Sequence, residues 1–349
     1  RDAFIDGLDP VNCYQAPSAL YLDTSSQTYD LATALSLSWI SLTALESTME
    51  NRSAFITQED IANNWQVTNI HSIENDARDL KIIIADYQDT VLVTFHHTDS
   101  HKNWLHNADD GLITNQIETK EHQPSFTLGE QTHDGFSRVL SAQWDQVLSE
   151  VKRRMAAKTD AHMAQKLWVF GHGLGAAFAQ LSAVGFEVEN IHVDQVYLSG
   201  SPKVGGQQWV EKADMLLNGR VHRLTNKNDL ISRLPVHHDA LDEFRAVSSI
   251  AIVNLTGGVS SNVQYGSLGR QVSLYDNSHV VWAPSDTVDL EKQYWLDMSD
   301  SLADAKHSSW GIPQQADSMR NVISKNLEHH LRSSDDGYFC GMINSLIAE

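Results

Sequence analysis

The 349-residue chain has few positive charges and no long apolar run. Lys and Arg number 25 against 45 Asp and Glu, so the formal net charge is −20. This balance argues against nucleic acid as a partner and against docking on an anionic membrane through a basic patch. The uncharged, apolar-leaning stretch at residues 31–45 contains Ser and Thr throughout and is shorter than the ~20 residues of a membrane span. Its apolar spacing predicts an amphipathic core helix instead.

Cysteine is nearly absent, and no spacing typical of metal ligands occurs. The two cysteines, Cys13 and Cys340, lie near opposite ends of the chain. Either they are free thiols of a reduced protein, or they form a disulfide in a secreted or periplasmic one. The chain has 17 histidines, but runs such as EHH at 328–330 lack the spacing of zinc-binding motifs. We expect no metal, no cofactor, and a secreted or periplasmic location.

The chain also lacks repeats and Pro/Gly/Ser linkers, which predicts a single domain over residues 1–349. Strand-like and helix-like segments alternate from residue 81 to 235, beginning with two β-rich runs joined at Gln88-Asp89. This alternation predicts an α/β fold with a mainly parallel central sheet and helices on both faces. Further β structure is expected between residues 248 and 283, and a helix near 315–332.

One glycine turn raises the question of function. The stretch "LWVFGHGLGAAFAQLSA" reads as a buried strand, a turn with glycine at positions 171, 173 and 175, and a helix. In outline this is a nucleophile elbow, where a strained central residue projects from the sheet and small neighbours prevent collision across the bend. A phosphate-cradling turn or a merely tight turn is the alternative. The central residue, Gly173, has no side chain.

Five segments in order resemble the class 3 (fungal-type) lipase family. They are GHGLG, similar to the family's G-H-S-L-G elbow; VLVTFHHTDSHKNWLHNAD, similar to F-R-G-T-x-S-x-x-N-W; HDGF, similar to H-x-G-F; VYLSGSPKVGG, similar to Y-T-F-G-x-P-R-V-G; and RLTNKNDLISRLP, similar to R-V-x-N-x-x-D-x-V-x-x-L-P. The resemblance implies an α/β-hydrolase fold with a lid around residues 99–130, near whose start Trp104 lies. Residues 236–300 are longer than the family's core requires and are interpreted as an insertion.

The resemblance also implies a Ser-Asp-His triad. It gives Gly173 the nucleophile position and Asp229 the acid that orients and stabilises the histidine. The base is assigned to His307, which precedes an aromatic residue by three positions and follows the acid in the order of α/β hydrolases. His279 is the runner-up, although its stretch is strand-like.

The oxyanion hole is assigned by the same resemblance to Thr98 and to the backbone N–H of Leu174. Asp99 would fix the Thr98 hydroxyl, and His172 would support the elbow by packing and hydrogen bonding. The chain departs from the family pattern at His96-His97, which replaces Arg-Gly.

The function implied is hydrolysis of lipid carboxylic esters, of the triacylglycerol lipase or phospholipase A type, at a lipid–water interface. Since Gly173 supplies no oxygen nucleophile, the chain as written is expected to be almost inactive. Three explanations stay open. The serine was replaced deliberately, or the chain is a natural pseudo-lipase that binds lipid or protein without hydrolysis. In the third, the turn is purely structural and the resemblance to lipases reflects common ancestry alone. The sequence does not say whether a protein inhibitor or chaperone binds it.

Overall fold

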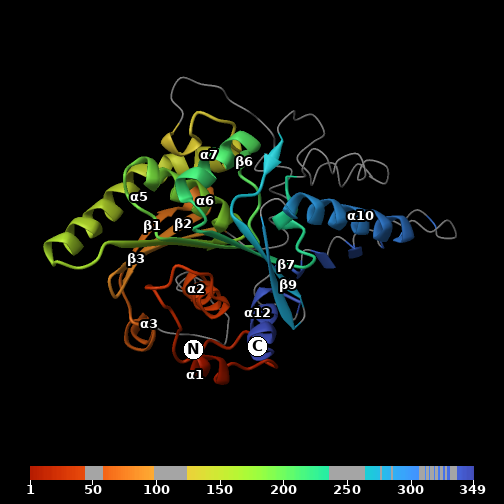
Figure 1. The fold of residues 1–349 in the computed structure, drawn as a ribbon, viewed down its shortest axis with the longest axis horizontal. Coiled ribbons are helices and arrows are strands. Elements are labelled where there is room, and N and C mark those ends of the chain that lie inside the picture. The colour runs from red at the N-terminus through yellow and green to blue at the C-terminus, as the bar shows by residue number, and fades with distance from the viewer. Residues whose placement is uncertain are drawn as a thin grey trace.

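The computed structural model has a central β-sheet with helices on both faces (Figure 1). The structure describes residues 1–43, 58–97, 124–235, 264–275, 277–283 and 286–305, part of 311–330, and 336–349. Within these residues the sheet has eight strands: β1 (Val67–Asn75), β2 (Leu80–Tyr87), β3 (Thr90–His97), β4 (Lys166–His172), β5 (Gln195–Ser199), β7 (Val221–Asn226), β9 (Arg270–Tyr275) and β10 (Ser278–Trp282). They lie side by side in this order. Pairing is parallel from β3 to β9 and antiparallel at both edges.

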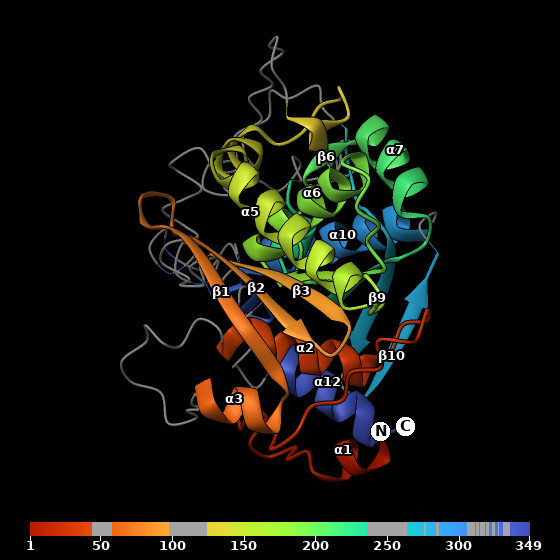
Figure 2. The ribbon, with the colours of Figure 1, turned by 90° about the vertical axis from the view of Figure 1, so that its left-hand side faces the viewer.

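Two layers of helices sandwich the sheet (Figures 1 and 2). One face carries α5 (Asp134–Asp160), α6 (Leu174–Val188), α7 (Gln207–Leu217) and α10 (Thr287–Ala305), and the other carries α1 (Asp2–Asp6), α2 (Leu31–Thr43), α3 (Gln58–Asn64) and α12 (Tyr338–Ile347). Side chains along β4 alternate between two apolar cores. Leu167 and Val169 join the α6 side, whereas Trp168 and Phe170 join the α2 side. The expected mainly parallel sheet with helices on both faces is confirmed.

The helix expected from residue 31 is present, but it is not amphipathic. Every residue from 31 to 42 is buried, because α2 packs against β3 and β4 of the sheet and against α12 beside it. Two of its serines form hydrogen bonds in this buried setting. Ser38 donates to the carbonyl of Ala34 at 2.9 Å, and Ser36 accepts from the backbone of Tyr21 at 3.0 Å. Neither α2 nor any other described helix is both long and apolar enough to cross a membrane.

The late strands belong to the central sheet. β9 pairs with β7 and β10 pairs with β9, which agrees with the β structure expected before residue 283. The region interpreted as an insertion, 236–300, therefore contributes two strands to the main fold. A short pair, β6 (Gly205–Gly206) with β8 (Tyr265–Gly266), forms a second sheet. Residues 236–263 lie outside the described part.

The two cysteines form a disulfide. Cys13 and Cys340 are bonded across 327 positions of sequence, which decides between the two interpretations of the cysteine pair. The bond joins the N-terminal segment to α12. Arg1 and Glu349 also form an ion pair at 2.7 Å, so both termini lie together beneath the sheet (Figure 1).

Candidate active site

The elbow has the backbone geometry that a nucleophile position requires. β4 ends at His172, α6 begins at Leu174, and Gly173 between them has φ 61° and ψ −128°. The left-handed φ is accessible to glycine and strained for other residues. The Gly173 N–H donates to the carbonyl of Ser199 at 2.9 Å, which ties the turn to the end of β5.

The outer glycines of the turn are required by close backbone contacts. A Cβ on Gly171 would lie 2.7 Å from the carbonyl of Gly175, and a Cβ on Gly175 would lie 2.1 Å from the carbonyl oxygen of Phe95 in β3. No side chain fits such distances. The glycine spacing therefore serves to bring the start of α6 against both its own turn and the neighbouring strand.

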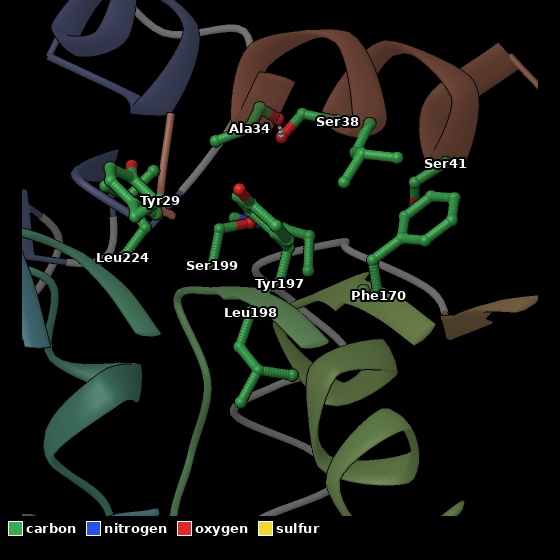
Figure 3. A pocket seen from close by; sticks show the side chains of 12 residues that line it. Tyr29, Ala34, Ser38, Ser41, Phe170, Tyr197, Leu198, Ser199 and Leu224 are labelled. Atoms are coloured by element: carbon green, nitrogen blue, oxygen red, sulfur yellow. Dashed lines mark hydrogen bonds between the residues drawn. The ribbon is translucent and has the colours of Figure 1, made fainter. Parts of the chain in front are cut away.

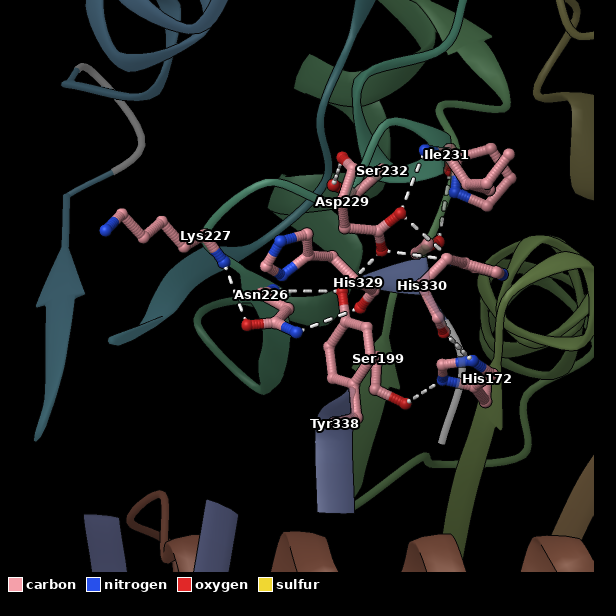
Figure 4. Close-up of polar contacts among 12 residues, drawn as sticks. His172, Ser199, Asn226, Lys227, Asp229, Ile231, Ser232, His329, His330 and Tyr338 are labelled. Atoms are coloured by element: carbon pink, nitrogen blue, oxygen red, sulfur yellow. Dashed lines mark hydrogen bonds and ion pairs between the residues drawn. The ribbon is translucent and has the colours of Figure 1, made fainter. Parts of the chain in front are cut away.

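Asp229 is a fully buried carboxylate at the same end of the sheet. It follows β7 by three residues, where it accepts the N–H of Ile231 at 2.9 Å and the hydroxyl of Tyr338 at 2.6 Å. Nδ1 of His330 lies 3.1 Å from Oδ1 and 3.0 Å from Oδ2 (Figure 4). Three donors from three parts of the chain thus converge on one carboxylate.

The electrostatics of this cluster keep Asp229 ionised. Burial alone would raise the pKa of the Asp229 carboxyl. The charge of His330 and the hydrogen bonds from His330 and Tyr338 outweigh burial and lower that pKa below its usual range. Burial, followed by the Asp229 charge, raises the pKa of the Tyr338 phenol far above its usual value, so the phenol remains a donor.

His330 is held on several sides. Its ring stacks on the ring of His172 with 4.8 Å between centroids, and its backbone carbonyl lies 2.9 Å from Nε2 of His172. A Cβ on Gly200 would lie 3.0 Å from Nδ1 and Cε1 of His330, so that glycine allows the ring to approach the loop after β5. The preceding carbonyl, of His329, accepts from the side chain of Asn226 at 2.9 Å. The orientation of the ring is therefore fixed by its surroundings.

His172 links the elbow to this cluster. Because its Nε2 faces a carbonyl, that nitrogen carries the proton, and Nδ1 accepts from the Ser199 hydroxyl 2.9 Å away. This geometry fits the supporting role expected for His172. Below it, a small cavity separates α2 from the ends of β4 and β5, lined by His172, Ser199, Tyr197 and Ser38 among others (Figure 3).

The structure brings together some of the residues that the sequence indicated. Gly173 and Leu174 form the elbow, and Leu174 is the buried first residue of α6. Asp229 lies on the loop after β7, as expected. Thr98, Asp99, Trp104 and His307 lie outside the described residues, as does most of the expected lid, 99–130.

The histidine beside the acid is one that sequence reasoning did not select. His330 occupies that place, while His279 lies in the edge strand β10, opposite Leu274 and partly exposed. The sequence offered only a weak signal for His330, which follows Asp229 in the chain, as the base follows the acid in α/β hydrolases, and lies shortly before Cys340 of α12. Tyr338, eight positions after His330, donates to Asp229 beside it. His96 and His97, which replace Arg-Gly of the family pattern, are the last residues of β3, and His97 is buried.

Residues 92–238 match the model of the family Lipase (class 3). The chain is 26% identical over 221 residues to Toxin TseL of Vibrio cholerae, covering 58% of this chain and 33% of the toxin. It is 23% identical over 119 residues to the secreted mono- and diacylglycerol lipase MDL5 of Malassezia globosa, covering 33% of this chain and 36% of that protein. The chain thus spans about a third of the length of these curated relatives.

Solved structures of fungal lipases share the fold. The lipase of Rhizopus microsporus var. chinensis gives a TM-score of 0.50 at 17% identity, covering 76% of this chain and 83% of that one. The Rhizomucor miehei lipase propeptide complex gives 0.52 at 17% identity, covering 76% and 75%. The chain has the α/β-hydrolase fold, and the match over residues 92–238 supports a relation to the class 3 lipases.

Proposed function

We propose that this chain is built as a lipid carboxylic-ester hydrolase of the triacylglycerol lipase or phospholipase A type, and that glycine stands at its nucleophile position. The observation that carries the proposal is the contact between Asp229 and His330, 3.0 Å apart and buried. A buried carboxylate on Nδ1 of a histidine is the acid–base half of an acyl-transfer triad. The elbow at Gly173, φ 61°, supplies the place for the other half.

Each residue then has a role. Asp229 holds the imidazole through Nδ1 and stabilises its protonated form, so Nε2 of His330 is the atom that takes and returns the proton. His330 replaces His307 and His279 as our candidate base. The backbone N–H of Leu174, at the start of α6 where N–H groups lack partners within the helix, and that of Thr98 would bind the oxyanion.

Glycine at position 173 limits what this machinery achieves. No Oγ is present to form an acyl-enzyme, so turnover is expected to fall to the roughly 10³–10⁴-fold enhancement over water that remains when a triad loses its nucleophile. This favours a second candidate function, in which the chain binds lipid or a partner protein without hydrolysis. The two candidates differ in the need for His330, because hydrolysis requires a base and binding does not.

The test restores the missing group. Gly173→Ser is assayed on p-nitrophenyl butyrate, tributyrin emulsion and phosphatidylcholine vesicles, and we expect activity to rise by about 10⁴-fold or more. Gly173→Ala is the matched control, because alanine meets the same backbone strain of roughly 1–3 kcal/mol without a nucleophile. No gain from serine in a folded protein would reject the hydrolase and favour the binding function.

The base is identified in the same background. We expect Gly173→Ser/His330→Ala to lose the restored activity and Gly173→Ser/His279→Gln to retain it. The reverse result would move the base to another histidine. The relative activity on triacylglycerol emulsion and phospholipid vesicles then decides between the two lipid classes.

We also propose a single domain and a secreted or periplasmic location. One sheet with a core on each face, and termini joined by the Cys13–Cys340 bond, support a single domain over residues 1–349. The disulfide supports an oxidising compartment, and two relatives are secreted lipases of Malassezia globosa. Detection of the oxidised protein outside the cytoplasm of its own cells tests the location.

A further inference from the structure

We propose that the chain, with glycine at position 173, uses a small external O–H nucleophile, water or methanol in preference to longer alcohols, and transfers an acyl group to it directly, without an acyl-enzyme. This activity rests on the proposed function, since it uses the same base and acyl site. It differs in that no acyl-enzyme forms. The nucleophile is water or a small primary alcohol, which gives hydrolysis or alcoholysis respectively.

The first support is that the acid–base pair keeps its geometry without a serine. Asp229 is fully buried and bonded to His330 at 3.0 Å, and the His330 ring is fixed by the stacked ring of His172, 4.8 Å between centroids. Nothing in this arrangement depends on an Oγ at position 173. With Nδ1 directed at the carboxylate, Nε2 lies on the opposite side of the ring, where a general base must act.

The second support is the size of the group that glycine leaves out. A serine side chain contributes one carbon and one oxygen, which are also the heavy atoms of methanol. Gly173 and its neighbours in the turn are buried, so a nucleophile that binds beside Gly173 would be enclosed by protein. A non-bonded nucleophile must lie somewhat farther from Cα than a bonded side chain, and each added carbon makes the fit worse. The structure therefore favours water and methanol over ethanol, and ethanol over propanol.

The reaction balances without any further reactant. The hydroxyl proton goes to Nε2 of His330 while the nucleophile oxygen bonds to the acyl carbon, whose carbonyl electrons move to the oxygen near the N–H of Leu174. Collapse of this tetrahedral intermediate breaks the bond to the leaving alcohol, which takes the proton from Nε2. An ester and an alcohol thus give a new ester and the displaced alcohol, or an acid when water attacks.

The absence of an acyl-enzyme predicts a kinetic signature. A serine hydrolase with two acceptors shows a ping-pong pattern and a burst of the first product, because the acyl group waits on the enzyme. Direct transfer requires ester and acceptor together, so the rate saturates with acceptor and no burst appears.

The experiment uses the full chain with p-nitrophenyl butyrate and increasing methanol, and methyl butyrate is measured by gas chromatography. Butyrate formed in ¹⁸O-labelled water measures the water reaction in parallel. We expect methyl ester formation to saturate with methanol and to fall in the order methanol, ethanol, propanol. His330→Gln is expected to lower it about 100-fold, in the range that a general base contributes.

Two variants separate the outcomes. Gly173→Ala places a methyl group in the space and is expected to lower methyl ester formation about 10-fold, whereas His279→Gln in the edge strand leaves it unchanged. Equal rates in the parent chain, Gly173→Ala and His330→Gln would overturn the proposal. If Gly173→Ser is active while the parent chain makes no methyl ester, external attack fails and the hydrolase assignment stands. If folded Gly173→Ser is also inactive, both fail.

Discussion

Tyr338 donates its hydroxyl proton to Oδ2 of Asp229 across 2.6 Å, although 109 residues separate the two in sequence. The same phenol oxygen accepts the backbone N–H of Asn226 at 2.9 Å. The end of β7, the acid and α12 are therefore joined at one buried oxygen. Tyr338 is a positioning residue, because it acts on the proposed base through Asp229.

Tyr338→Phe removes both bonds and leaves the Asn226 N–H without that acceptor. We expect the free energy of unfolding of the parent chain to fall by about 1–3 kcal/mol, measured in urea. Loss of the Tyr338 hydroxyl also raises the pKa of Asp229, because the hydrogen bond from Tyr338 is one of the interactions that lower this pKa. A carboxyl whose pKa is lower in the folded state than in the unfolded state stabilises the fold at pH values above the unfolded-state pKa. This stabilisation is lost as the pH falls through the folded-state pKa. Because the variant has a higher folded-state pKa, it should unfold at a higher pH during acid titration.

A structural role alone predicts no change in the pH profile of activity. In the Gly173→Ser background we therefore expect Tyr338→Phe to lower kcat about 10-fold and to move the acid limb of the profile upward. An unchanged acid limb in a folded variant would contradict the positioning role.

Burial of His133 in its neutral form is expected to make the folded chain less stable in mild acid. It is the N-cap of α5, where its Nδ1 accepts the N–H of Phe136 at 3.3 Å, and burial lowers its pKa to about 3. The unfolded chain binds this proton below about pH 6.5 and the folded chain does not, so stability falls from that pH toward 3 by up to about 1.4 kcal/mol per pH unit. His133→Asn keeps a cap acceptor without titrating. Urea unfolding between pH 7.5 and 5 should give a shallower slope for the variant, and equal slopes would reject this assignment.

Lys203 holds the loop that follows Asp229. Its ammonium group is buried and donates to the carbonyls of Arg233 and Pro235 at 2.9 and 2.8 Å and to Glu291 at 2.6 Å. Lys203→Met removes the buried cation beside the Glu291 carboxylate and is expected to lower the free energy of unfolding by about 3–5 kcal/mol. Combining it with Glu291→Gln should cost less than the sum of the single changes, by about 0.5–3 kcal/mol in a double-mutant cycle. Strict additivity would show that the two charges do not interact.

Gly175→Ala tests the close approach of α6 to β3. The new methyl group would meet the Phe95 carbonyl at 2.1 Å, so the elbow must move, and we expect destabilisation above about 3 kcal/mol or no folded protein. Gly7→Ala is the control, since its Cβ meets only ordinary contacts at 3.5 Å and its φ of −87° suits alanine. Thermal melts of both variants make the comparison. Similar melting temperatures would mean that the contact at Gly175 relaxes without cost.

The parts of the site that were predictable from the sequence are those whose geometry is local. The glycine spacing of the turn follows from contacts within five residues and with one neighbouring strand, so the pattern GHGLG indicates the elbow. Asp229 follows its strand directly. His330 has no such local signature, because its place is determined by His172, Asp229 and Gly200 from three distant segments.

The complete burial of α2 was unpredictable for a similar reason. Its apolar spacing reads as one buried face, and only tertiary packing decides that the sheet and α12 bury the whole helix, with Ser38 and Ser41 lining the cavity beside β4 and β5. The hydrogen bond from Ser38 to the Ala34 carbonyl lowers the cost of burying that hydroxyl.

The Cys13–Cys340 bond has a consequence for the whole molecule, because it closes nearly all of the chain into a covalent ring. A single protease cut at any peptide bond between the two cysteines opens the ring but releases no fragment. Both pieces stay in one molecule until the disulfide is reduced. A nicked protein therefore migrates at full mass without reductant and separates into two bands with it, and the sizes of those bands locate the cut.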